Sequence, residues 1–318
     1  MDRVVIGVDL GGTNTRTALV ARSGDILEKQ KEETLAAEGH EKVIAKLIGN
    51  IDRQRANADQ YGRRVAAVGV GAPGVIYEQT GVVVKSPNFP DWNELPLKQI
   101  LEGELKLPVF IENDANAAAL GEQWRGAAKD IRSMIFLTLG TGVGGGIILD
   151  GRIWHGADGM AGEVGHMTII PDGRTCGCGN RGCLEMYASS RGIVMTFKAM
   201  CAEKRLDAED RQELTSAQIY QAARNGDTVA HLVMKDMGRY LGIGIANLIN
   251  IFNPEMVVIG GGVMDAWDLF IDATREEVRK RAFAYTAERT KIVPSMLGDE
   301  AGMVGAAAVA FQKIAKLS

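Results

Sequence analysis

The sequence VVIGVDLGGTNTRTALV, at residues 4–20, joins two apolar runs through a glycine-rich turn. The same plan returns at residues 134–149, which read MIFLTLGTGVGGGIIL. Short apolar runs bounded by glycines are typical of buried strands, so each stretch predicts two strands connected by a tight turn. Two such stretches indicate a chain with two halves built on one plan.

Strand and helix patterns alternate outside these two stretches. Apolar runs predict further buried strands at 65–70, 108–111 and 256–259. Helical spacing or an excess of helix-forming residues predicts helices at 43–51, 115–124, 186–250, 267–278 and 302–311. The mixture indicates an α/β protein with two continuous lobes.

Composition places the chain among ordinary globular proteins. Its 318 residues correspond to about two domains, and 46% hydrophobic with 24% charged residues excludes a disordered chain. Lys and Arg number 36 against 40 Asp and Glu, a net charge of −4, which argues against a nucleic-acid or membrane partner. No targeting segment or membrane span is recognisable, so we expect a cytoplasmic protein.

The first glycine turn has the chemistry of a phosphate site. Gly11 and Gly12 allow backbone N–H groups to approach a ligand closely, and Thr13 and Asn14 add side-chain donors. Asp9, at the end of the first strand, could hold a magnesium ion. The alternative is an ordinary hairpin turn. No Gly-Lys-Ser/Thr follows and a strand comes next, which excludes a P-loop and a dinucleotide fingerprint.

Two further glycine runs follow predicted strands. Residues 140–146 hold five glycines in seven positions, more than a structural turn needs, which predicts close approach of an anionic ligand to this loop. Gly260, Gly261 and Gly262 follow the strand at 256–259, where an adenine or ribose can lie against the backbone. Close packing of a helix on that strand is the alternative.

Asn113 and Asp114 separate a predicted strand from a predicted helix. A carboxylate at the carboxyl end of a buried strand can accept a proton from a substrate hydroxyl. The alternative is that the pair caps the helix, because Asn and Asp lead the ranking of N-cap residues. Local sequence leaves both open.

The spacing of His166, Cys176, Cys178 and Cys183 is the most specific signal in the chain. Three thiolates and one imidazole satisfy a tetrahedral zinc ion, and such closed sites are usually structural. Cys201 lies outside the cluster and is expected to be a buried small hydrophobe. The other histidines show no convincing partner and are expected on the surface: His40, His155 and His231.

Acidic side chains flank this cluster. Glu163 and His166 are three residues apart on a backbone rich in glycine, and Glu185 follows the last cysteine. Carboxylates and an imidazole in this arrangement suit recognition of neighbouring hydroxyl groups. If His166 gives one ring nitrogen to zinc, the other can hydrogen-bond a ligand. The alternative is that both glutamates are solvated surface acids.

Together, these motifs resemble the ROK family of sugar kinases and sugar-responsive repressors. The resemblance rests on residues 9–15, 113–114, 139–146 and 163–185, in this order along the chain. It implies an actin-like, ribonuclease-H-like two-lobe α/β fold with ATP and sugar in the cleft and a zinc knuckle in the second lobe. The lobes are expected at 1–113 with the C-terminal helix at about 302–318, and at 114–301.

The resemblance also implies roles, position by position. Asp114 is expected to be the catalytic base and a sugar ligand. The other expected sugar ligands are Gly74, Asn113, Glu163, His166 and Glu185. The residues expected at ATP and magnesium are Asp9, Gly11, Gly12, Thr13, Asn14, Thr141, Gly142, Gly260 and Gly261. The expected zinc ligands are His166, Cys176, Cys178 and Cys183.

The activity that follows is ATP-dependent phosphorylation of the 6-hydroxyl of a hexose. The loop SPNFPDW at 86–92 is similar to that of the glucokinase members of the family, so glucose is the expected sugar, and a homodimer the expected assembly. Kinases for N-acetylmannosamine, N-acetylglucosamine, allose or fructose share the same motifs. A sugar-sensing regulator without catalysis and an actin-like filament ATPase are further alternatives. Family repressors carry an N-terminal DNA-binding extension, and this sequence begins at the first predicted strand.

Overall fold

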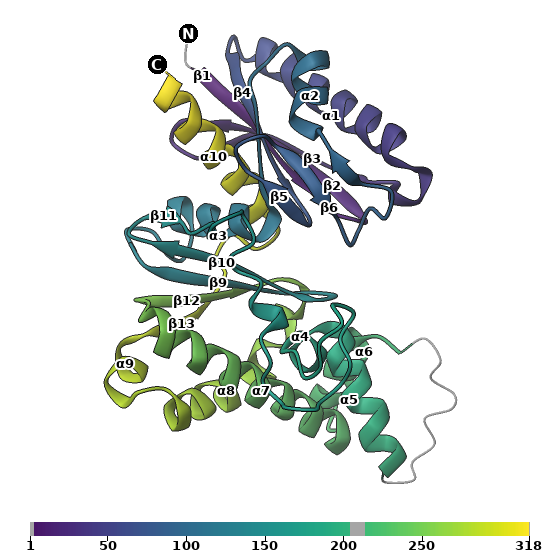
Figure 1. Cartoon of the computed structure of the whole chain (residues 1–318), viewed down its shortest axis with the longest axis vertical. Coiled ribbons are helices and arrows are strands. Elements are labelled where there is room, and N and C mark those ends of the chain that lie inside the picture. Colours follow the sequence, from purple (N-terminus) through teal and green to yellow (C-terminus); the bar gives the residue numbers. More distant parts are fainter. Residues whose placement is uncertain (1–2, 204–213, 318) are drawn as a thin grey trace. The chain divides into compact units, whose positions relative to one another are not determined.

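The computed structural model describes residues 3–203 and 214–317, and its contacts divide the chain into two compact units. Unit 1 comprises Met1–Arg132, Gly146–Gly162 and Met296–Ser318, and unit 2 comprises Ser133–Gly145 and Glu163–Ser295. The course of the chain can be followed in Figure 1. Residues 204–213 of the stretch expected to be helical lie outside the described residues.

The sheet of unit 1 has the strand order β3-β2-β1-β4-β8. Its strands are β1 (Arg3–Leu10), β2 (Asn14–Ala21), β3 (Ile26–Glu33), β4 (Arg64–Ala72) and β8 (Val109–Asn113). The first three pair antiparallel, whereas β1, β4 and β8 are parallel. The register sets Asp9 beside Gly71, and Ala72 beside Asn113. The carboxyl ends of these strands therefore bring two of the expected site segments to one edge.

Side chains alternate between the two faces of this sheet. Val4, Ile6 and Val8 belong to a buried cluster that includes residues of α1 (His40–Gln60) and α2 (Leu97–Leu105). Val5 and Ala18 pack instead against α10 (Ala301–Leu317). Strand periodicity thus gives the sheet one apolar layer on each side.

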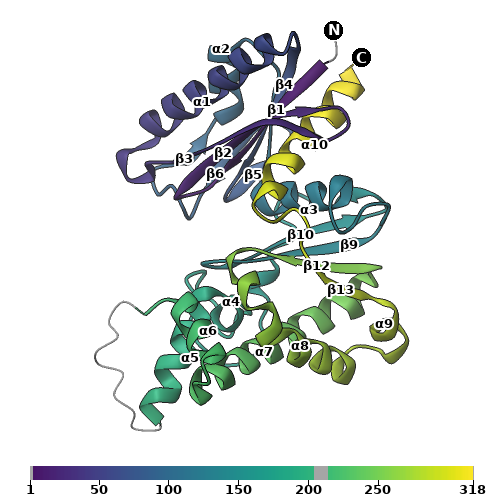
Figure 2. The ribbon, with the colours of Figure 1, turned by 180° about the vertical axis from the view of Figure 1, so that it is seen from behind.

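Helices α3 (Asp114–Arg125) and α10 (Ala301–Leu317) pack on each other, as both ribbon views show (Figure 2). A Cβ at Gly305 would lie 1.6 Å from the carbonyl oxygen of Ala117, and one at Gly121 would lie 2.3 Å from that of Ala301. Glycine is therefore required for this backbone contact. The contact places α3 in unit 1, whereas the expected division assigned 114–301 to the second lobe.

A second sheet has the order β11-β10-β9-β12-β13. Its strands are β9 (Met134–Leu139), β10 (Val143–Leu149), β11 (Arg152–Ile153), β12 (Met256–Gly260) and β13 (Lys291–Pro294). β12 pairs parallel with both β9 and β13. In unit 2, the buried side chains of β9 and β12 share a core with α7 (Thr228–Phe252) and α8 (Trp267–Arg281).

The remaining elements are short. A small sheet contains β5 (Val75–Tyr77), β6 (Val82–Lys85) and β7 (Asn93–Leu95). The other α-helices are α4 (Glu185–Ala188), α5 (Ser190–Glu203), α6 (Ser216–Arg224) and α9 (Ala284–Arg289), and 3-10 turns lie at Ala36–Glu38, Val164–His166, Gly262–Ala266 and Gly298–Glu300. In the described part of the chain, no helix combines the length and apolar character that a membrane crossing needs.

The repeated plan is confirmed, because each large sheet holds two neighbouring strands joined by a glycine turn. Several elements of the structure were not predicted from the sequence: α2, α9, β5, β6, β7, β11 and β13. Two further differences concern β3 and the second glycine loop. β3 was not predicted, because its sequence ILEKQKEE is largely polar and partly exposed. The second glycine loop is shorter than expected: Gly146 lies in β10, where a Cβ would approach Ala119 Cβ to 2.7 Å. Packing, not a ligand, therefore explains this glycine.

Candidate active site

The turn at residues 10–14, between β1 and β2, is held on several sides. The Gly11 N–H donates to the carbonyl of Asn14 at 3.0 Å, and Thr34 donates through its hydroxyl to Gly11 O at 2.7 Å. The Thr34 N–H also donates to the Thr13 carbonyl at 2.8 Å. Thr13 itself is exposed. The turn is thus a braced hairpin that presents Thr13 to solvent.

Asp9 is the charged group nearest to this turn in sequence. Its carboxylate lies 3.2 Å from Arg16, which also pairs with Asp299 at 2.8 Å. Burial raises the pKa of Asp9 above its ordinary value, and Arg16 acts in the opposite direction. A Cβ at Gly302 would lie 2.7 Å from Asp9 Cγ. A cation at Asp9 would therefore share the carboxylate with Arg16.

At the start of α3, the capping role and the expected catalytic role fall on two different residues. Asn113 is the N-cap, and its Oδ1 accepts the N–H groups of Ala115 at 2.9 Å and Asn116 at 3.1 Å. Its Nδ2 donates to the carbonyl of Gly74 at 3.2 Å. Asp114 is the first residue of the helix, and its Oδ1 accepts the Ala115 N–H at 2.8 Å. Asn113 thus fills the cap, and the carboxylate of Asp114 lies in the first turn of the helix.

Gly74 is fixed by its backbone. Its φ is 114°, and a Cβ would lie 2.2 Å from the carbonyl oxygen of Lys85. A side chain at this position would break both the turn and the contact with β6. Gly74 and Asn113, both expected sugar ligands, are therefore neighbours in unit 1.

In unit 2, the turn at residues 140–142 contacts Glu185. The Val143 N–H donates to Glu185 Oε2 at 3.1 Å, and a Cβ at Gly142 would lie 2.2 Å from the same oxygen. A Cβ at Gly165 would lie 2.0 Å from the carbonyl oxygen of Val143. Gly142 and Gly165 thus allow the turn at 140–142 to contact both the carboxylate of Glu185 and the 3-10 turn Val164–His166.

The four predicted metal ligands converge. The ligand atoms of His166, Cys176, Cys178 and Cys183 all lie within 4.8 Å of one another. Cys176 Sγ is 3.6 Å from His166 Nδ1, and Cys178 Sγ is 3.7 Å from Cys183 Sγ. For normal zinc bond lengths, a tetrahedron separates sulfur from nitrogen by about 3.5 Å and sulfur from sulfur by about 3.8 Å. These residues, called the Cys3His cluster below, therefore fit a zinc ion.

The orientation of His166 leaves its second nitrogen for another partner. Nδ1 faces the cluster, and Nε2 lies 3.9 Å from Glu163 Oε2. Glu163 is 56% exposed, whereas Glu185 is half-buried, with Oε1 3.9 Å from Cys176 Sγ.

Burial raises the pKa of the Cys183 thiol to about 12. A bound cation would reverse that preference, because it stabilises thiolates.

Gly260 is the last residue of β12, where packing accounts for the glycine, and Gly261 follows the strand. Gly260 is buried, and a Cβ there would lie 3.0 Å from the Phe136 ring. Gly261 is exposed, with φ 92°, and its Cβ position lies 2.5 Å from the carbonyl oxygen of Leu139. Since Leu139 precedes the turn at 140–142, Gly261 lies beside that turn.

Two residues near Asp114 were not expected. Glu112, in β8, is 2.8 Å from Nε2 of His155. The expectation that His155 and His40 lack partners was wrong, because His40 pairs with Asp91 at 3.0 Å. Strand β8 also runs two residues beyond the predicted 108–111. In the sequence, the one signal for this pair was the charged residue Glu112, which stands between an apolar run and Asn113.

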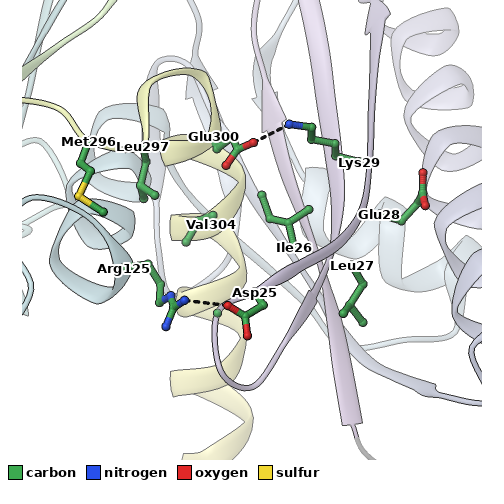
Figure 3. Close-up of a pocket in the computed structure, with 11 residues that line it drawn as sticks. Asp25, Ile26, Leu27, Glu28, Lys29, Arg125, Met296, Leu297, Glu300 and Val304 are labelled. Carbon is green, nitrogen blue, oxygen red and sulfur yellow. Dashed lines mark hydrogen bonds and ion pairs between the residues drawn. The ribbon is translucent and has the colours of Figure 1, made fainter.

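A surface pocket of about 630 Å³ in unit 1 contains none of the expected site residues (Figure 3). Its charged side chains pair across it, Arg125 with Asp25 at 2.7 Å and Lys29 with Glu300 at 2.6 Å. A ligand in this pocket could therefore bind Arg125 or Lys29 only if the ion pair of that residue were broken.

Comparison with known proteins identifies the family. The model of the ROK family matches residues 5–313. A glucokinase of Halalkalibacterium halodurans is 39% identical over 310 residues, 96% of this chain and 94% of that protein. A xylose repressor of Caldicellulosiruptor bescii is 36% identical over 309 residues, 96% of this chain and 77% of that protein.

The crystal structure of a ROK family glucokinase from Streptomyces griseus in complex with glucose and AMPPNP shares the fold. Its TM-score is 0.82 at 37% identity, covering 97% of this chain and 99% of that one. The expected actin-like α/β fold is thus confirmed. The chain belongs to the ROK family.

Proposed function

We propose that this chain is an ATP-dependent sugar kinase that transfers the γ-phosphoryl group to the 6-hydroxyl of a hexose, and that the hexose is glucose. The observation that carries the proposal is the start of α3, where Asn113 caps the helix and Asp114 keeps its carboxylate at the helix N-terminus. The similarity to two glucokinases, one crystallised with glucose and AMPPNP, supports the same activity.

In this mechanism Asp114 accepts the proton of the sugar hydroxyl as the hydroxyl oxygen attacks the γ-phosphorus; the bond from that phosphorus to the bridging oxygen breaks, and ADP leaves. Positioning and electrostatics dominate such transfers, so the backbone N–H groups of the two glycine turns matter most for the phosphates. Asp9 is the residue proposed to hold magnesium, directly or through water. Magnesium, when bound with ATP, would neutralise phosphate charge.

The proposed ligands are distributed over both units. Those for the sugar are Gly74, Asn113 and Asp114 in unit 1, and Glu163, His166 and Glu185 in unit 2. Those for ATP and magnesium are Asp9, Gly11, Gly12, Thr13 and Asn14 in unit 1, and Thr141, Gly142, Gly260 and Gly261 in unit 2. The Cys3His cluster is proposed to hold a structural zinc ion that orients His166.

The experiment is a sugar panel in a coupled ADP-release assay. Glucose, fructose, allose, N-acetylglucosamine and N-acetylmannosamine are compared with no sugar, and glucose is expected to give the highest kcat/KM. A higher kcat/KM for another sugar would mean that this sugar, not glucose, is the substrate, and the proposal of a sugar kinase would stand. ADP release independent of sugar contradicts the proposal and indicates a filament-type ATPase.

A regulator without catalysis is the second candidate, favoured by the similarity to a xylose repressor. Isothermal titration of the same sugars distinguishes the two. Sugar binding with no turnover supports the regulator, whereas binding with turnover supports the kinase. A cytoplasmic homodimer is the proposed form, and analytical ultracentrifugation tests the dimer.

A further inference from the structure

Glu112 is a buried carboxylate immediately before Asn113 and Asp114. It is 3% exposed and is the next-to-last residue of strand β8. Oε1 accepts the N–H of Asn113 at 3.1 Å and Nδ2 of Asn116 at 3.0 Å. Oε2 accepts from His155 Nε2 at 2.8 Å. Both oxygens of this carboxylate therefore have partners, as a buried charge requires.

His155 supplies the partner that comes from a distant part of the chain. It lies 43 residues beyond Glu112, in the segment after β11, and its side chain is 29% exposed. A carboxylate can only accept, so Nε2 carries the hydrogen. The hydrogen bond with Glu112 raises the pKa of His155 above its ordinary value. The pair belongs wholly to unit 1.

The other two hydrogen bonds of Glu112 come from residues on either side of Asp114 in the sequence. Asn113 precedes it, and Asn116 follows within the first turn of α3. The oxygen of Asn113 in turn accepts the Asn116 N–H, so residues 112–116 form a closed network, called the Asp114 turn below. Two side-chain hydrogen bonds join this network to separate segments: His155 reaches Glu112, and Asn113 Nδ2 donates to the carbonyl of Gly74.

Loss of the hydrogen bond from His155 would leave one oxygen of a buried carboxylate without its donor. Such a group costs free energy until it reaches water. If Glu112 moved toward solvent, the Asn113 N–H and the Asn116 amide would lose their acceptor. Displacement by about 1 Å can cost about 10²-fold in rate when a catalytic group depends on position.

We infer that His155 is a positioning residue, which acts through Glu112 to fix the turn that carries Asp114. The inference rests on the proposed function, because phosphoryl transfer to sugar is its main readout. It assigns His155 no contact with sugar or ATP.

The test compares His155→Leu with His155→Gln, whose amide can still donate to Glu112. His155→Leu is expected to lower kcat about 10- to 100-fold, with KM for ATP changed less than about twofold. His155→Gln is expected to recover most of kcat. His231→Leu, at an exposed position of α7, is the control and should match the wild type. Circular dichroism at the assay temperature establishes that each variant is folded.

Two results would overturn the inference while leaving the kinase in place. One is wild-type kcat in folded His155→Leu. The other is an equal loss in His155→Gln, since the donor would then be irrelevant. If the wild type itself releases no ADP with any sugar, the proposed function fails instead.

A second measurement does not depend on turnover. The His155 imidazole is titrated by NMR in the wild type and in Glu112→Gln. A pKa that is above 6.5 in the wild type and lower in the variant supports the pair. An unchanged pKa would mean that the two groups do not interact in solution, and the inference would be withdrawn.

Discussion

The Asp114 turn and the Cys3His cluster hold their side chains by different means. In the Asp114 turn, a helix cap and a buried carboxylate bind residues that are close in sequence, with His155 and Gly74 as the distant partners. In the cluster, ligands spread over 166–183 meet at one point. The first is a network of several bonds, and the second is suited to one ion. Damage to the turn should therefore be graded, whereas damage to the cluster should be all-or-none.

The largest effect is expected at the centre of the Asp114 turn. Asp114→Asn should lower kcat by about 10³-fold, because a general base contributes on the order of 10²–10⁴. Sugar affinity by isothermal titration should change little. Asp59→Asn, on the exposed side of α1, is the matched control. Near-normal turnover in Asp114→Asn would remove it from the catalytic role.

Cys178→Ser breaks the cluster at its exposed ligand. Metal content by elemental analysis should fall to background, and KM for sugar should rise about 10- to 100-fold, since a bound metal orients the residues around it. Cys201→Ala lies outside the cluster and should retain the metal. Purified wild type without zinc would contradict the proposed metal site.

Gly142→Ala tests the contact between the glycine turn at residues 140–142 and the carboxylate of Glu185. The added methyl would meet Glu185 Oε2 at 2.2 Å, so KM for sugar should rise by about tenfold, in the range of a displaced binding contact. A Cβ at Gly140 meets nothing within 4 Å, so Gly140→Ala should have a smaller effect. Equal effects would show that the contact with Glu185 does not matter.

The smallest effect concerns pH. The Glu112 hydrogen bond raises the pKa of His155 in the folded chain, against the opposite effect of burial, so protonation stabilises the fold. This contribution is complete below about pH 6.5 and disappears as pH rises through the folded pKa. The difference in Tm between wild type and His155→Gln should therefore shrink from pH 6 to pH 8. A constant difference would contradict the charged pair.

Local patterns predicted the elements that carry their own signal. Short apolar runs located β1, β2, β4 and β9, and the Cys and His spacing located the cluster, because both depend on residues close in sequence. β3 was missed because an edge strand with polar side chains has no apolar period. The roles of Asn113 and Asp114 stayed open, because an N-cap and a base use the same residue types.

Long-range pairing explains the rest. Glu112 and His155 are 43 residues apart, and nothing in either neighbourhood indicates the other. The purpose of Gly146 was likewise hidden, since a glycine needed for helix packing looks the same in sequence as one needed for a ligand. Such features become visible only when the fold brings distant segments together.

The place of α10 has a consequence for synthesis on the ribosome. Met303 and Ala307 close one face of the sheet that begins at β1, and Gly305 seats the helix against α3. Unit 1 therefore lacks this layer while the chain between β1 and α10 is synthesised, and gains it only when α10 has emerged. During that interval a nascent chain exposes the apolar side chains of Val5 and Ala18, and chaperones can cover them.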